Sequence, residues 1–130
     1  MSDADVATVV AREPAVRAAW IFGSRARGEE RRGSDLDVAV LLVPGASRDL
    51  LTRLSGGLSQ RCGVEADVVD VARATPVLGF EIVFGGRRIF ARDAEATVAA
   101  DDAEERCLRA YLDTAHMRRV QHHYLYGDPL

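Results

Sequence analysis

The chain has 130 residues, of which 48% are hydrophobic and 28% are charged. This length allows one domain with a single sizeable core, and the composition is typical of a soluble globular protein. A net charge of −3 argues against a surface built to hold long nucleic acid, and no apolar stretch approaches the ~20 residues of a membrane span. All 17 basic residues are arginine, so phosphate contacts must come from arginine, backbone N–H groups or a metal ion.

The two cysteines and the first residues bear on where the protein works. Cys62 and Cys107 match neither a metal-binding spacing nor a disulfide framework, so we expect both thiols to be reduced. The opening MSDADVATVV lacks the basic segment of an export signal. We therefore expect a cytoplasmic protein.

The chain begins with a short helix and a strand. Ser2 and Asp5 resemble a capping box ahead of a helix over residues 3–13. Residues 16–22, VRAAWIF, predict a first strand in which the tryptophan belongs to the core. Residues 24–30 allow one or two helical turns.

A second strand and a longer helix follow. Residues 36–43, rich in valine and leucine, predict a central strand. Ser47 is placed to cap a helix over residues 48–61, which Cys62-Gly63 ends. The apolar stripe of this helix consists of Leu50, Leu51, Leu54 and Leu58.

The second half predicts a third strand over 65–72, a short apolar helix over 76–86 and an edge strand over 87–91. Residues 93–125 have a strongly helical pattern, whose expected buried side is Leu108, Tyr111, Leu112, Ala115 and Val120. This alternation of helices and strands predicts one α/β or α+β domain.

Two acids open the predicted central strand. Asp35 and Asp37 point to one face because side chains alternate along a strand, and they lie about 7 Å apart. At an effective dielectric constant of ~20, two such anions repel by roughly 2 kcal/mol. Asp67, in the next valine-rich strand, is placed to add a third carboxylate. Such a cluster suits hard divalent cations, which take oxygen ligands.

Gly23 and Ser24 lie where the first strand ends. A glycine there, followed by serine at the start of a helical turn, offers N–H groups and a hydroxyl to phosphate oxygens. No GxxxxGK[ST] and no GxGxxG sequence is present. A phosphate holder beside metal ligands suits a metal-bound nucleoside triphosphate.

The segment GSRARGEERRGSDLD resembles the Gly-Ser, ten residues, Asp-x-Asp pattern of the polymerase-β-like nucleotidyltransferase superfamily. Within it, the chain is similar to the minimal nucleotidyltransferases (MNT) paired with HEPN-domain toxins. The resemblance covers about residues 5–93. It implies a small mixed sheet flanked by helices, followed by the helical segment 93–125, in one domain over residues 1–130.

The resemblance also implies roles for individual residues. Gly23 and Ser24 would hold the triphosphate of ATP, and Asp35 and Asp37 would bind two Mg²⁺ ions. Asp67 would complete the metal site and help to activate a hydroxyl that attacks the α-phosphate, so that pyrophosphate leaves.

The third acid departs from the family pattern, because the small Ala66 precedes it where a bulky apolar residue is common. Glu65 shares the predicted face of Asp67 and could replace it as a ligand. Asp70 lies on the opposite face and ranks lower.

Four arginines follow Ser24. Arg25 and Arg27 could bind phosphates through bidentate contacts. They could equally lie on an exposed turn, balanced by the glutamates that follow. Arg31 and Arg32 are expected on the loop surface.

The C-terminal RRVQHHYLYG loosely resembles the ribonuclease motif of HEPN toxins. Its spacing is inexact, and its residues are common on helix surfaces, so we interpret the likeness as coincidence and leave the role of these residues open. They are Arg118, His122, His123 and Tyr124.

The resemblance therefore implies transfer of AMP from ATP to a hydroxyl of a cognate HEPN ribonuclease toxin, with tyrosine as the expected acceptor. The chain would act as an antitoxin. A domain this small leaves little room to bind an acceptor alone, so the toxin would dock on the apolar, aromatic side of residues 93–125. The alternatives are a nucleotidyltransferase for small molecules such as aminoglycosides, with a pocket completed by a dimer, and a binding protein that masks the toxin without catalysis. The oligomeric state stays open.

Overall fold

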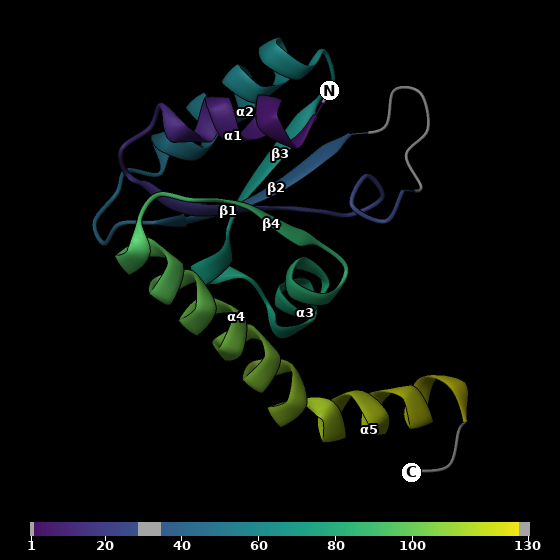
Figure 1. Ribbon diagram of the computed structural model, residues 1–130. Coiled ribbons are helices and arrows are strands. Elements are labelled where there is room, and N and C mark those ends of the chain that lie inside the picture. The colour runs from purple at the N-terminus through teal and green to yellow at the C-terminus, as the bar shows by residue number, and fades with distance from the viewer. Residues whose placement is uncertain (1, 29–34, 128–130) are drawn as a thin grey trace.

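The computed structural model describes residues 2–28 and 35–127. Its centre is a mixed sheet of four strands: β1 (Val16–Phe22), β2 (Leu36–Leu42), β3 (Ala66–Asp70) and β4 (Arg87–Ala91) (Figure 1). The order across the sheet is β3-β2-β1-β4. β1 is antiparallel to both neighbours, whereas β3 is parallel to β2. The mixed sheet and the edge position of the strand over 87–91 are as the sequence predicted.

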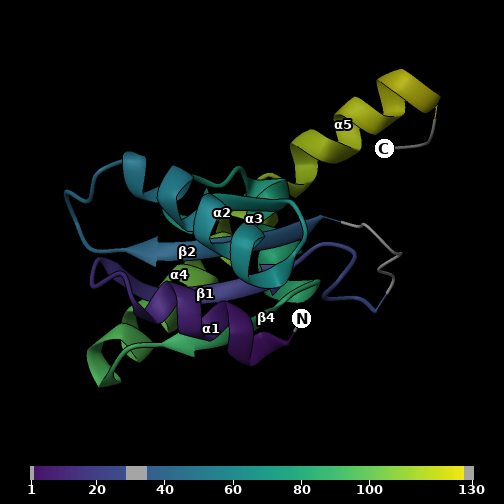
Figure 2. The ribbon, with the colours of Figure 1, turned by 90° about the horizontal axis from the view of Figure 1, so that it is seen from above.

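Helices cover both faces of the sheet. α1 (Asp3–Ala11) and α2 (Asp49–Cys62) lie on one face, and α3 (Pro76–Phe84) and α4 (Ala94–Asp113) lie on the other (Figure 1). α5 (Ala115–Tyr126) projects away from the sheet in both views (Figures 1 and 2). None of the described helices is both long and apolar enough to cross a membrane.

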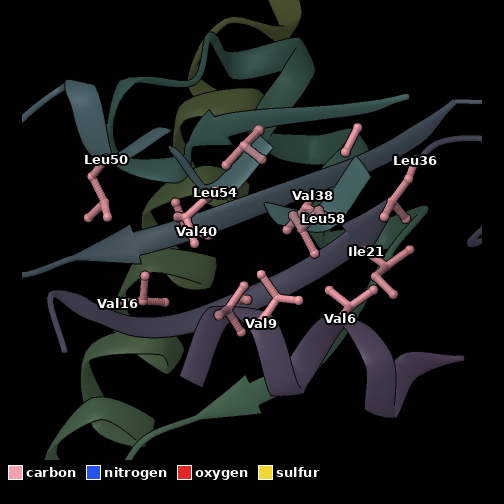
Figure 3. Packing of buried hydrophobic residues seen from close by; sticks show 14 residues of the cluster. Val6, Val9, Val16, Ile21, Leu36, Val38, Val40, Leu50, Leu54 and Leu58 are labelled. Carbon is pink, nitrogen blue, oxygen red and sulfur yellow. The ribbon is translucent and has the colours of Figure 1, made fainter. Parts of the chain in front are cut away.

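Two buried clusters fill the space between the layers, because successive strand side chains point to opposite faces. Strand valines and leucines meet α1 and α2 on one side, as Figure 3 shows for Val38, Val40 and Leu58. On the other side, Trp20 is only 1% exposed, and its indole N–H donates to Glu104 Oε2 at 2.7 Å. The polar atom of this large core residue is therefore satisfied.

The helix predicted over 93–125 is two helices that meet at Thr114. The Thr114 hydroxyl donates to the carbonyl groups of Ala110 and Tyr111 at 3.0 and 3.1 Å, a bond type that bends helices. The expected buried side is only partly covered: Leu108, Tyr111, Ala115 and Val120 are half-buried, whereas Leu112 is 61% exposed and α5 has no fully buried residue. The residues that α4 buries are its small ones, Ala96, Ala100 and Ala103, which let the helix lie close to the sheet.

Smaller differences concern the ends of elements. The capping box of Ser2 and Asp5 is present. Arg48, not Ser47, is the N-cap of α2, although the Ser47 hydroxyl accepts a hydrogen bond from the backbone N–H of Asp49 at 3.2 Å. Gly63 ends α2 in the left-handed region with φ 70°. The third strand is shorter than predicted, because a 3₁₀ helix follows at Val71–Arg73.

Candidate active site

The predicted acids meet where β2 and β3 begin. Asp37 on β2 is directly opposite Asp67 on the parallel strand β3. Asp35 immediately precedes β2 and is exposed, as is Asp67, whereas Asp37 is partly buried. The parallel pairing thus places carboxylates from segments thirty residues apart at one edge of the sheet.

The electrostatics of Asp37 confirm that these charges are close to one another. Burial raises the pKa of the Asp37 carboxyl above its usual value, and the negative charges of Asp67, Asp35 and Glu81 raise it further. Arg27 opposes them with a positive charge. Asp37, the least exposed of the three predicted acids, therefore lies among several negative charges, a combination common at functional sites.

Gly23 lies against the Asp37 carboxylate. It follows β1, whose last residue, Phe22, pairs with Asp37, and it adopts φ +75°. A Cβ atom built on Gly23 would overlap Asp37 Oδ2 and lie 3.2 Å from Cγ. Both the backbone conformation and the close approach therefore require glycine at this position.

The segment after Gly23 is a hydrogen-bonded turn over residues 24–28 and not the helical start that the sequence allowed. The backbone N–H of Arg27 donates to the Gly23 carbonyl at 3.3 Å. Ser24 is partly buried in this turn. Residues 29–34, including Arg31 and Arg32, lie outside the described part of the chain.

The two arginines of the turn have different surroundings. Arg27 forms an ion pair with Glu81 at 3.3 Å, and its charge lowers the pKa of Asp37. Arg25 instead acts on Cys62 at the end of α2, where its charge opposes the rise in the pKa of that thiol caused by burial. Arg27 is therefore the arginine placed beside the carboxylates.

Glu81 was missed by the sequence reasoning. It is the only charged residue of α3, PVLGFEIVF, and its charge raises the pKa of Asp37. A single acid in an otherwise apolar helix was the signal that could have identified it.

Of the alternative third acids, Asp70 accepts a hydrogen bond from the backbone N–H of Ala72 at 3.0 Å and caps the 3₁₀ helix. Glu65 is exposed and is not among the charges that act on Asp37.

The donor set fits a hard cation, because carboxylate oxygens are the ligands that Mg²⁺ takes and a cation would relieve the repulsion at Asp37. The fit concerns the chemistry of the acids and not their arrangement, because within residues 2–28 and 35–127 no three histidine, cysteine or acidic residues are grouped to hold a metal ion.

The C-terminal cluster takes no part in this site. Arg118 donates to the Thr114 hydroxyl and to the Tyr111 carbonyl, and its guanidinium lies 3.6 Å from the centroid of the Tyr111 ring. It therefore stabilises the junction of α4 and α5. His122 and His123 contact tyrosine rings of their own helix.

Residues 4–95 match the model of the polymerase beta nucleotidyltransferase family. The chain belongs to this family, which confirms the resemblance found in its Gly-Ser and Asp-x-Asp spacing.

Two relatives are named as protein adenylyltransferases. MntA of Shewanella oneidensis is 29% identical over 77 residues, which cover 59% of this chain and 55% of MntA. A provisionally named protein adenylyltransferase of Methanocaldococcus jannaschii is 40% identical over 63 residues, 48% of this chain and 68% of that protein. The match therefore spans about half the length of MntA.

Solved structures share the fold. A crystal structure of a toxin–antitoxin with AMP-PNP matches with a TM-score of 0.76 and 20% identity, over 92% of this chain and 94% of the other. A structure of tri-AMPylated Shewanella oneidensis HEPN toxin in complex with MNT antitoxin matches with a TM-score of 0.70 and 18% identity, over 91% and 90%. The likeness extends beyond the family match, because it covers more than nine-tenths of the chain.

We expect Gly23→Ala to lower nucleotidyl transfer at least about tenfold, because the added methyl group must displace the Asp37 carboxylate or the turn. Steady-state kinetics would measure the loss. Gly45→Ala is the matched control: Gly45 has φ +79° but open space around it, so the backbone strain is similar and the overlap is absent. Equal losses in both variants would contradict the role of the Gly23–Asp37 contact.

We expect Asp37→Asn to raise the melting temperature of the metal-free protein by about 2 °C at pH 7. Folding raises the pKa of Asp37, so its charged form is less favourable in the folded chain than in the unfolded chain. That penalty is present above the raised pKa and disappears below the ordinary value of 3.8, so the gain should vanish near pH 3.

Thermal unfolding at both pH values would measure this effect. Asp70→Asn is the control, because asparagine still offers an acceptor to Ala72 and removes a charge not among those acting on Asp37. A lower melting temperature for Asp37→Asn at pH 7 would contradict the repulsion.

Proposed function

We propose that this protein is an ATP- and Mg²⁺-dependent nucleotidyltransferase that transfers AMP to a tyrosine hydroxyl of a cognate HEPN ribonuclease toxin and thereby acts as its antitoxin. The observation that carries the proposal is the close approach of the Gly23 turn to Asp37, which in turn is opposite Asp67. The protein adenylyltransferases among its relatives support AMP as the transferred group. The proposed place of action is the cytoplasm.

In this proposal Asp35 and Asp37 would hold two Mg²⁺ ions, and Asp67 would be the further ligand. Bound Mg²⁺ supplies Lewis-acid stabilisation of the nucleophile and of the departing pyrophosphate. The Gly23-Ser24 turn binds the triphosphate, and Arg27 contributes a positive charge beside it. The acceptor oxygen bonds to the α-phosphorus as the bond to the bridging oxygen breaks, and Asp67 receives the hydroxyl proton. The chain thus acts chiefly by positioning and charge stabilisation.

A partner is needed to bring the acceptor, and the C-terminal helices offer a surface for it. α5 leaves Met117 and Tyr124 71% and 82% exposed. A mainly apolar cavity of about 610 Å³ lies between α5 and the start of α3, lined in part by Pro76, Val77 and Val120. We infer that the toxin docks on this surface, which we name the α3–α5 groove. The toxin complex of the structurally similar MNT antitoxin supports this partner.

We expect the protein, supplied with labelled ATP and Mg²⁺, to transfer the label to its cognate toxin. The double variant Asp35→Asn, Asp37→Asn should reduce this labelling at least about 100-fold, and chelation of Mg²⁺ should have the same effect. Mass spectrometry would locate AMP on a tyrosine. Asp70→Asn should remain active. Consumption of ATP with an aminoglycoside and not with the toxin would favour the small-molecule alternative. Full toxin neutralisation by the double variant would favour simple masking.

We expect Met117→Asp to weaken toxin binding at least about tenfold, because a charge in the α3–α5 groove must be desolvated on docking. Titration calorimetry would measure toxin binding, with ATP binding as a check on the site. Val98→Asp is the matched control: Val98 is similarly exposed but lies in the first half of α4, outside the groove. Unchanged toxin affinity in Met117→Asp would place the toxin elsewhere.

A further inference from the structure

The turn that approaches Asp37 is linked both within itself and to a neighbouring strand. Among its described residues, the backbone N–H groups of Arg27 and Gly28 donate to the carbonyl groups of Gly23 and Arg25, both at 3.3 Å. A side chain of β4 adds a hydrogen bond of the same length from outside the turn.

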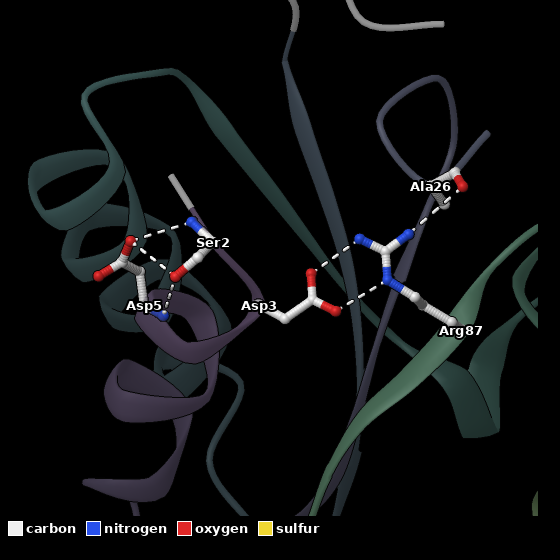
Figure 4. Close-up of polar contacts among 5 residues, drawn as sticks. All are labelled: Ser2, Asp3, Asp5, Ala26 and Arg87. Atoms are coloured by element: carbon white, nitrogen blue, oxygen red, sulfur yellow. Dashed lines mark hydrogen bonds and ion pairs between the residues drawn. The ribbon is translucent and has the colours of Figure 1, made fainter. Parts of the chain in front are cut away.

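Arg87, the first residue of β4, lies next to this turn (Figure 4). Its Nη1 donates to the Ala26 carbonyl at 3.3 Å. Its Nε and Nη2 donate to the two carboxylate oxygens of Asp3 at 2.9 and 2.7 Å. The guanidinium thus joins the turn to the first residue of α1, and the fork on Asp3 fixes the direction in which Nη1 points.

Both ends of this link are fixed by the fold. Arg87 pairs with Ile21 of β1. A Cβ atom on the preceding Gly86 would lie 2.5 Å from the Ile21 carbonyl oxygen, so the start of β4 packs closely against the end of β1. Asp3 lies next to Ser2, whose capping box fixes the start of α1. Arg87 also lowers the pKa of the Asp3 carboxyl through their hydrogen bonds, so Asp3 is ionised at neutral pH.

We propose that Arg87 is a positioning residue of the nucleotide site: held by Asp3, its guanidinium fixes the Ala26 carbonyl and thereby the Gly23–Gly28 turn beside Asp37. This inference rests on the proposed function for its effect on ATP, but the effect on the turn is independent of it. The planar fork is essential, because an ammonium group has no fixed geometry that serves the carboxylate and the carbonyl together. Arginine, and not merely a positive charge, is required.

The test compares Arg87→Lys with Arg92→Lys. Arg92 also binds backbone carbonyl oxygens, those of Val16, Glu13 and Ala11 at 2.9, 2.9 and 3.1 Å, but these lie at the opposite end of β1 from the turn. Both variants keep the positive charge and remove contacts of a guanidinium group with backbone carbonyl oxygens; only Arg87 also binds a carboxylate, that of Asp3. Arg87 contacts the turn, whereas the contacts of Arg92 are remote from it.

We expect Arg87→Lys to raise the KM for ATP about fivefold with a smaller change in kcat, and Arg92→Lys to lower the melting temperature without changing this KM. Amide hydrogen exchange of the ligand-free protein should be faster over residues 23–28 in Arg87→Lys only. Asp3→Asn should act in the same direction, and its effect should not add to that of Arg87→Lys.

Unchanged exchange over residues 23–28 in Arg87→Lys, or an equal increase in Arg92→Lys, would overturn the inference. Faster exchange in Arg87→Lys with unaltered ATP kinetics would overturn its link to the nucleotide. If the natural protein uses no ATP at all, the proposed function fails, while the exchange measurement still decides whether Arg87 holds the turn.

Discussion

The approach of the Gly23 backbone to the Asp37 carboxylate is the contact on which the candidate site depends. β1 ends and β2 begins at this point, so one antiparallel pair supplies both the turn and the acid. The parallel pairing of β2 with β3 then sets Asp67 opposite Asp37. A shift of one residue in either pairing would turn one of these side chains to the other face of the sheet. The hydrophobic alternation that fixes the register for packing therefore also fixes the site.

The site has an unfavourable electrostatic arrangement within a well-packed fold. Trp20, Arg87 and Arg88 have acidic partners, whereas Asp37 is surrounded mainly by other acids. Natural proteins tolerate such local repulsion where function requires it. Arg27, which offsets part of that charge, is itself paired with Glu81. Asp3 and Arg87 hold the turn on one side and Glu81 contacts it on the other, so three distant segments converge on a few residues.

The local sequence pattern was sufficient to predict the helices and strands and to recognise the Gly-Ser and Asp-x-Asp motif. The strands over 16–22 and 87–91 were predicted with their observed bounds, and the spacing from Gly23 to Asp37 identified the family. The contacts of Glu81 and Arg87 were beyond such reasoning, because they join residues more than fifty positions apart, although Glu81 stands out as the single acid of an apolar helix. The helical start after Ser24 was wrong, since the chain forms only a turn there. Which third acid acts, and whether metal ions bind, remain proposals that the family pattern supports.

The error over residues 93–125 and the proposed docking surface have a common explanation. The helical periodicity of the sequence predicts that the large apolar residues form the buried side. In this segment those residues are Leu108, Tyr111, Leu112 and Val120. The single chain instead buries alanines of α4, because the helix lies too close to the sheet for larger side chains. A twelve-residue helix such as α5 is marginal in water without packing of an apolar face. Met117 and Tyr124 of this helix stay largely exposed, so a partner that covers them, as we propose, would supply the missing packing.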